Sequence, residues 1–175
     1  MKVAILLPPR DFKDESVSHA MAMLEKWHVS PVITSYASGE CIGYHGAAFK
    51  TQINAATLDP DEFDAIMIVD GVGVDTYKLY DFRPLLDTLR LFSAKKKIVA
   101  GISNGIKVLA RANIIADAKV SIPNNDEVRR LVSLYKGVPS KNYIEFDKNI
   151  LTLSIPDPDK VTEFASVLIE KLGVK

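Results

Sequence analysis

The stretch Gly101-Ile102-Ser103-Asn104-Gly105 decides the fold that we predict for this chain. It follows an apolar run at 97–100 that has the length of a buried strand, and it precedes a segment at 106–112 that favours a helix. The spelling G-x-S-x-G is that of a nucleophile elbow, in which glycines permit a sharp turn and the serine oxygen stands exposed above the sheet. We therefore predict Ser103 at a strand-to-helix corner. The alternative is a plain structural turn, because glycine-flanked serines are common at such corners.

Length and charge limit the classes of function. A chain of 175 residues can bury a full core, and nothing in it indicates a boundary, so we expect one domain over residues 1–175. Its 22 basic and 22 acidic residues cancel, and no basic run alternates with aromatic residues. This pattern argues against a nucleic-acid or membrane partner and favours a small molecule or another protein.

Targeting and metal signals are absent from the sequence. The apolar run at 3–7 is too short for a signal-peptide core or a membrane span and ends at Pro8-Pro9, so we expect a cytoplasmic protein. The single Cys41 excludes an internal disulfide, and the three histidines show no metal-ligand spacing. The G-x-G at 71–73 lacks the later glycine and the distant acid of a dinucleotide fingerprint. We expect neither a metal nor a cofactor.

Hydrophobic periodicity divides the chain into strands and helices. Predicted strands cover 2–7, 32–36, 65–69, 97–100 and 119–122, and predicted hairpins cover 39–53 and 143–153. Predicted helices cover 16–27, 82–92, 106–112 and 125–135, with a capped turn at 59–63 and a last helix starting near 156–159. Buried strands separated by helices predict an α/β sandwich with a mostly parallel sheet and an antiparallel margin.

Three loops follow strands that this pattern places inside the sheet. Glu15 lies after the first strand, residues 70–75 follow the strand at 65–69, and Ser103 follows the strand at 97–100. Because crossovers are right-handed, the carboxyl ends of parallel strands meet at one edge, where open α/β sheets bind ligands. We expect these three loops to converge there.

Several segments together resemble the ThiJ/PfpI superfamily, and specifically its short PfpI-type intracellular protease branch. The resemblance runs over nearly the whole chain and rests on residues 1–6, Gly43-Tyr44-His45-Gly46, residues 61–65, the Gly71 loop and the elbow. It implies a flavodoxin-like sandwich, related to the class I glutamine amidotransferase domain, that dimerises or builds larger rings. Members of that family act as proteases, glyoxalases, deglycases, chaperones or oxidation sensors.

The resemblance gives the elbow residues particular roles. The protease branch carries a cysteine followed by a histidine, and Ser103 and Asn104 stand at those two positions here. The nucleophile and the general base are thus both replaced, and a serine hydroxyl loses more than a thiol does when no base is present. Asp75 resembles an acid that reaches the neighbouring subunit's histidine, which implies a crevice near a subunit boundary.

Two further positions carry over from the family. A glutamate from the loop after the first strand faces the family's cysteine, and Glu15 is the nearest acid here. Ser16 takes that place if Phe12 matches the family's loop aromatic. The family's Pro-Gly-Gly loop supplies an oxyanion-hole amide, and Asp70-Gly71 keeps its second glycine.

Three hypotheses about function follow. The first is a protein with a degenerate site that binds a small molecule, or serves in stress response, without protease or glyoxalase turnover. The second is a serine-dependent hydrolase in which Ser103 acts with Glu15, and the third is a structural oligomer with a filled or closed crevice. The catalytic candidates are Ser103, Glu15 and Asp75, and the binding candidates are Asp70, Gly71 and Asn104. The first two hypotheses differ in whether a base lies within hydrogen-bond reach of the Ser103 oxygen.

Overall fold

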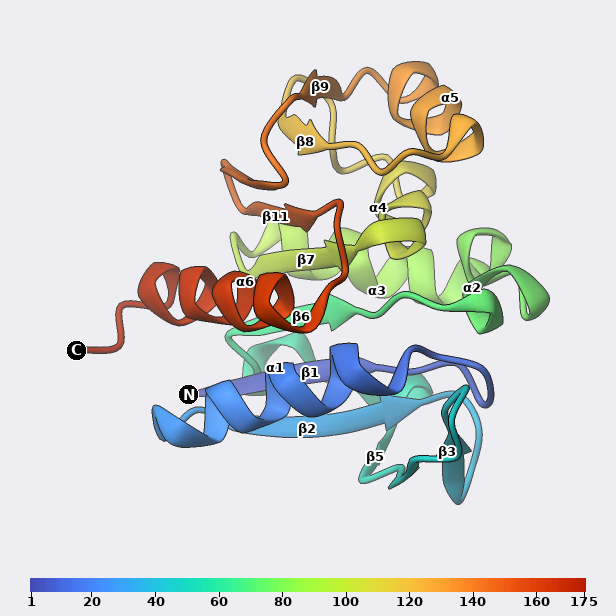
Figure 1. Ribbon diagram of the computed structural model, residues 1–175, viewed down its shortest axis with the longest axis vertical. Helices are drawn as coiled ribbons and strands as arrows, with labels where there is room; N and C mark the ends of the chain where they lie inside the picture. Colours follow the sequence, from blue (N-terminus) through green and yellow to red (C-terminus); the bar gives the residue numbers. More distant parts are fainter.

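The computed structural model describes all residues from 1 to 175 and is built on a seven-stranded sheet (Figure 1). The order of its strands is β10-β11-β7-β6-β1-β2-β5. Their bounds are Lys2–Leu6 (β1), Ser30–Ser35 (β2), Ile53–Asn54 (β5), Ala65–Ile68 (β6), Ile98–Ile102 (β7), Ile144–Asp147 (β10) and Ile150–Leu153 (β11). Every neighbouring pair is parallel except β10 and β11. The predicted α/β fold with an antiparallel margin is confirmed.

Helices cover both faces of this sheet. The helices are α1 (Asp14–Lys26), α2 (Val72–Thr76), α3 (Arg83–Ala94), α4 (Ile106–Arg111), α5 (Asp126–Leu134) and α6 (Pro158–Lys171). α1 and α6 pack side by side on one face, while α3 and α4 lie on the other (Figure 1). None of the helices combines the length and apolar character that a membrane crossing requires.

Alternation along the central strands divides the core into two halves. In β1, Val3 and Ile5 belong to the cluster under α1 and α6, whereas Ala4 and Leu6 belong to the cluster under α3 and α4. Successive side chains of a strand point to opposite faces, so a strand covered on both faces must be apolar throughout. This requirement explains the continuous apolar runs of the sequence.

Smaller elements surround the main sheet. β3 (Glu40–Ile42) and β4 (Ala48–Lys50) form the predicted antiparallel hairpin at the margin. β8 (Lys119–Ser121) pairs in parallel with β9 (Val138–Ser140), apart from the main sheet. Four 3-10 turns complete the fold: η1 (Ala55–Thr57), η2 (Pro60–Glu62), η3 (Leu79–Asp81) and η4 (Ser103–Gly105).

The prediction for residues 70–75, near the site, was wrong. Residues 70–75 were expected to be a glycine-bearing loop, but the short helix α2 begins within them, at Val72. Gly71 precedes the helix with φ of 126°, and a Cβ there would lie 2.4 Å from the carbonyl oxygen of Asp11. A five-residue helix is too short to produce a helical period in the sequence. The corner after β6 is therefore tighter and more ordered than predicted.

Candidate functional site

Ser103 lies at the corner between β7 and α4. β7 runs two residues further than expected, to Ile102, and η4 then leads into α4. Ser103 has φ of 48°, in the left-handed region that costs a non-glycine residue about 1 kcal/mol or more. Backbone strain of this kind persists where the surrounding structure holds it, and such places are often functional.

Gly101 and Gly105 were expected to permit the sharp turn, but the structure shows that they are needed for close packing instead. Gly105 has φ of −61°, and a Cβ at this position would lie 2.7 Å from the carbonyl oxygen of Val69 and 2.9 Å from that of Ile68. A Cβ at Gly101 would lie 3.0 Å from Leu109 Cδ1. The glycines thus let β6 and α4 approach the corner closely.

Asn104 ties the corner to the loop after β6. Its Oδ1 accepts the N–H of Gly71 at 3.0 Å, and its Nδ2 donates to the carbonyl oxygen of Gly71 at 2.7 Å and to Asp75 Oδ2 at 3.1 Å. Both N–H groups of the Asn104 amide and its oxygen are therefore engaged. The amide of Gly71, which the resemblance made an oxyanion-hole donor, is occupied by this side chain.

A buried lysine continues the network behind Asn104. The side chain of Lys107 is 1% exposed, and its Nζ forms ion pairs with Asp75 Oδ1 and, at 3.0 Å, with Glu127 Oε2. Its ammonium also lies 5.1 Å from the centre of the Tyr80 ring. Burial alone would lower the pKa of Lys107, but hydrogen bonds to the two carboxylates outweigh it and raise the pKa. Lys107 is therefore a fixed positive charge between α2 and α5.

The β3–β4 hairpin is held against the start of α1. Asp14 is 7% exposed and its carboxylate accepts the backbone N–H groups of His45 at 2.9 Å and Ala47 at 2.8 Å. Burial would raise the pKa of Asp14, but these two hydrogen bonds outweigh it, so the pKa is lowered. A Cβ at Gly43 would lie 2.5 Å from the Asp14 carboxyl group, so the glycine permits this contact. The Gly43-Tyr44-His45-Gly46 motif is thereby placed beside α1.

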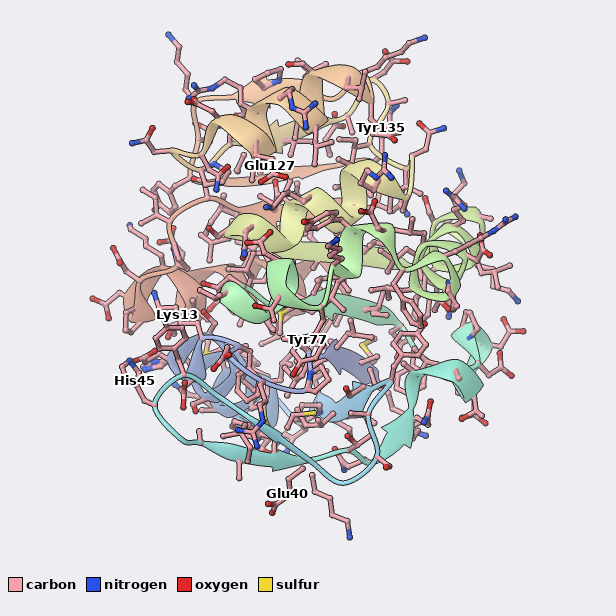
Figure 2. The ribbon with its side chains drawn as sticks, turned by 90° about the vertical axis from the view of Figure 1, so that its right-hand side faces the viewer. Lys13, Glu40, His45, Tyr77, Glu127 and Tyr135 are labelled. Carbon is pink, nitrogen blue, oxygen red and sulfur yellow. The ribbon has the colours of Figure 1, made fainter.

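A cavity of about 300 Å³ opens between this hairpin, the start of α1 and the corner after β6. Seven residues line it: Lys13, Glu15, Tyr44, His45, Asp70, Gly71 and Val72. Figure 2 looks onto this edge of the sheet and shows Lys13 and His45 side by side, far from Glu127. The ammonium of Lys13 donates to the carbonyl oxygen of Pro156 at 2.6 Å.

Asp70 is the most buried residue of the cavity lining, with 4% of its surface exposed. Burial raises its pKa to about 6, and the negative charge of Glu15 adds to this, while the Ser16 hydroxyl and the positive charge of Lys13 act in the opposite direction. Its Oδ1 is buried without a hydrogen bond of normal geometry, and the same holds for the nearby Ser16 hydroxyl and for Glu15 Oε2. Unpartnered buried acceptors are rare in proteins, so two in one cavity need an explanation.

The structure divides the candidate residues into two groups that meet at Gly71. Glu15, Asp70 and Gly71 line the cavity, whereas Asn104 and Asp75 belong to the hydrogen-bonded network behind it. Ser103 stands at the corner but does not line the cavity, and its hydroxyl makes no hydrogen bond to any protein group. Two of the three loops that were expected to converge therefore line the cavity, namely those that carry Glu15 and Asp70, and the loop that carries Ser103 does not.

Four residues of this region were not predicted to belong to the site. Lys13 and Val72 line the cavity, and Lys107 and Glu127 support the network. Lys107 had a detectable signal, because it stands among apolar residues near the start of the predicted helix at 106–112, and a lysine is buried there only when it is paired. The other three have no local signal, since their partners are distant in the sequence.

Comparisons with known proteins identify relatives over most of the chain. The DJ-1/PfpI family model matches residues 1–171. An uncharacterized protein of Methanocaldococcus jannaschii is 29% identical over 156 residues, which are 89% of this chain and 76% of the relative. The deglycase PfpI of Pyrococcus furiosus is 25% identical over 119 residues, which are 68% of this chain and 70% of the relative.

Solved structures agree with this assignment at the level of the fold. The crystal structure of a ThiJ/PfpI domain protein from Brachyspira murdochii superimposes with a TM-score of 0.91 at 24% identity. The superposition covers 98% of this chain and 96% of that chain. The flavodoxin-like α/β fold that the resemblance implied is thereby confirmed.

Proposed function

Because this chain belongs to the DJ-1/PfpI family, we propose that it is a cytoplasmic member with a degenerate site, which binds a small molecule and does not act as a protease or glyoxalase. In this proposal Ser103 stands where the family has its nucleophilic cysteine, and Asn104 stands where the protease branch has its histidine. The ligand binds in the cavity beside Gly71.

The observation that carries the proposal is the isolation of the Ser103 hydroxyl. It makes no hydrogen bond to a protein group, so no base is in place to take its proton. Asn104 has no titratable proton at neutral pH, and its amide is already engaged with Gly71 and Asp75. The Gly71 N–H is engaged as well and is not free to stabilise an oxyanion.

The cavity supports a binding role for the same edge of the sheet. Its volume of about 300 Å³ lies at the lower end of the range for small-molecule sites. Its lining combines charged, aromatic and apolar side chains from three separate segments. Ligand sites of open α/β sheets lie at this carboxyl edge.

Catalysis and its absence are tested by comparing wild type with Ser103→Ala. We expect wild type and Ser103→Ala to hydrolyse p-nitrophenyl acetate, and to consume methylglyoxal, at the same rates. Both rates should equal the background rate measured with heat-denatured protein. Circular dichroism of the variant controls for folding. A rate that is enzymatic in wild type and vanishes in Ser103→Ala would overturn the proposal.

A serine-dependent hydrolase is the second candidate, and the backbone of Ser103 favours it. The φ of 48° places this half-buried residue in a strained conformation of the kind that occurs at functional sites. In this candidate Glu15, whose Oε2 has no partner, would serve as the base after a change of side-chain rotamer. Hydrolysis that is lost in both Ser103→Ala and Glu15→Gln is its expected signature.

We propose further that the protein forms at least a dimer through the region of α2. Val72, Tyr77 and Phe82 are 50%, 41% and 38% exposed, and Tyr77 and Phe82 border a common groove. Exposed large apolar side chains that gather in one region mark interaction surfaces. Sedimentation velocity at micromolar concentration should show a dimer or larger species that Tyr77→Glu dissociates. A wild-type protein that sediments only as a monomer would contradict this.

A further inference from the structure

We propose that the cavity beside Gly71 binds its ligand through a primary ammonium group held between the carboxylates of Glu15 and Asp70. This inference rests on the proposed binding function and names the chemical class of the ligand. Both carboxylates line the cavity, one from α1 and the other from the corner after β6 (Figures 1 and 2 show these elements meeting at the carboxyl edge).

The unpartnered oxygens decide that the ligand is a hydrogen-bond donor. Asp70 is 4% exposed, and neither its Oδ1 nor Glu15 Oε2 has a hydrogen bond of normal geometry in the protein. Ionised carboxylate oxygens only accept hydrogen bonds, so a ligand group that has no N–H or O–H would leave the two carboxylates unsatisfied. An anionic ligand is disfavoured for the same reason, because it would place a third negative charge beside the two.

The charge of the cavity lining favours a ligand whose donor group is an ammonium over one whose donor group is a neutral hydroxyl. Lys13 is the one ammonium in the lining, and its Nζ is directed to the carbonyl oxygen of Pro156. Glu15 and Asp70 therefore both line the cavity, each with one oxygen shielded from solvent, and neither carboxylate forms an ion pair. A buried charge is costly unless it is paired, and an ammonium supplies both the charge and three N–H donors.

The rest of the lining fits an alkyl stem behind the ammonium. Val72 is 50% exposed and Tyr44 is 59% exposed, and both border the cavity. An aliphatic chain can pack against Val72, and the Tyr44 ring can also attract a cation. The cavity volume of about 300 Å³ suits a small alkylamine rather than a polymer or a nucleotide.

Three probes of equal length and different charge test this inference. n-Butylammonium, n-butanol and butyrate are titrated at pH 7.5 and low ionic strength, and binding is followed by saturation-transfer NMR of the probe. We expect saturable binding of n-butylammonium, in the millimolar range because a small ligand makes few contacts, and no saturable binding of butyrate. Val72→Trp tests whether the probe binds in the cavity, because the larger side chain fills the cavity and should abolish the signal.

Charge-removing variants test the two carboxylates. Glu15→Gln and Asp70→Asn should each weaken n-butylammonium binding about tenfold or more, as expected for the loss of one charge-assisted hydrogen bond. Glu62→Gln is the matched control, since Glu62 is an exposed acid on η2 outside the cavity, and should leave binding unchanged. Circular dichroism verifies that each variant is folded.

The outcomes separate this inference from the proposed function. Binding of n-butanol or butyrate that is as strong as that of n-butylammonium, and that Val72→Trp abolishes, would overturn the ammonium site while leaving a small-molecule site in place. Butylammonium binding that survives both Glu15→Gln and Asp70→Asn would also overturn it, and so would the failure of all three probes to bind. Serine-dependent hydrolysis would instead refute the proposed function, whatever the probes do.

Discussion

Replacing Asp70 by asparagine should stabilise the protein at neutral pH. Asp70 is 4% exposed, and burial raises the pKa of its carboxyl group from 3.8 to about 6. A shift of about two units at about 1.4 kcal/mol each amounts to about 3 kcal/mol that the ionised carboxylate costs the folded state. Asparagine has nearly the same shape and no charge, although its N–H groups need partners, so we expect a gain of about 1–3 kcal/mol at pH 7.5.

The sign of the pH dependence follows from the direction of this shift. Below about pH 4 the carboxyl of Asp70 is protonated in both the folded and the unfolded chain, so it costs nothing. Between pH 4 and 6 the unfolded chain loses the proton while the folded protein keeps it, and the folded state loses stability as pH rises. Above pH 6 the loss is complete. The advantage of Asp70→Asn should therefore be near zero at pH 4 and largest above pH 6.

Urea unfolding followed by circular dichroism at pH 4, 5, 6 and 7.5 measures this difference directly. Glu62→Gln serves as the control, because it removes one exposed carboxylate and should change the free energy of unfolding by only a few tenths of a kcal/mol. A variant that is less stable than wild type at pH 7.5, or a gain that does not vary with pH, would refute the reasoning. Either result would mean that the Asp70 carboxylate is well solvated or paired in the folded protein.

Three further substitutions test the corner and its network. Asn104→Ala removes three hydrogen bonds at about 1 kcal/mol each and should lower the free energy of unfolding by about 2–3 kcal/mol in urea titration; an unchanged value would show that water replaces the amide. Lys107→Met keeps the buried stem but leaves the carboxylates of Asp75 and Glu127 without their cation. Because protonation removes the charges of these two carboxylates, the free energy of unfolding of the variant in urea should rise relative to that of wild type as pH falls from 7 to 4. Ser103→Cys should give a thiol that peroxide oxidises, seen as a mass gain that wild type lacks, because the amides at the start of a helix favour the thiolate while the native Cys41 is fully buried. An inert thiol at position 103 would contradict an activating corner.

The amino-acid sequence determined most of the secondary structure, because the period of apolar side chains is a local property. The buried runs of β1, β6 and β7 and the helices α3 and α5 were all predicted. Asn125 caps α5, because its Oδ1 accepts the N–H groups of Glu127 and Val128. The strands β5 and β9 were missed, since two or three residues are too few to show an alternation.

The location of Ser103 at a strand-to-helix corner was also predictable from local spacing. Glycine flexibility does not explain this corner, because Gly105 is required by the carbonyl oxygens of Val69 and Ile68, which are more than thirty residues away in the sequence. The turn itself is made by Ser103 with φ of 48°, and no pattern in the sequence distinguishes such a serine from an ordinary one.

Only the tertiary structure decided which groups share a cavity and which are fixed by partners. Asn104 engages Gly71 and Lys107 engages Glu127 because packing of the layers brings segments 20 to 33 residues apart into contact. The cavity exists because Asp14 holds the β3–β4 hairpin over the start of α1. Hydrogen bonds and burial of this kind depend on distances through space, which local periodicity does not encode, so the sequence predicted the edge at which the site lies and the folded chain determined its chemistry.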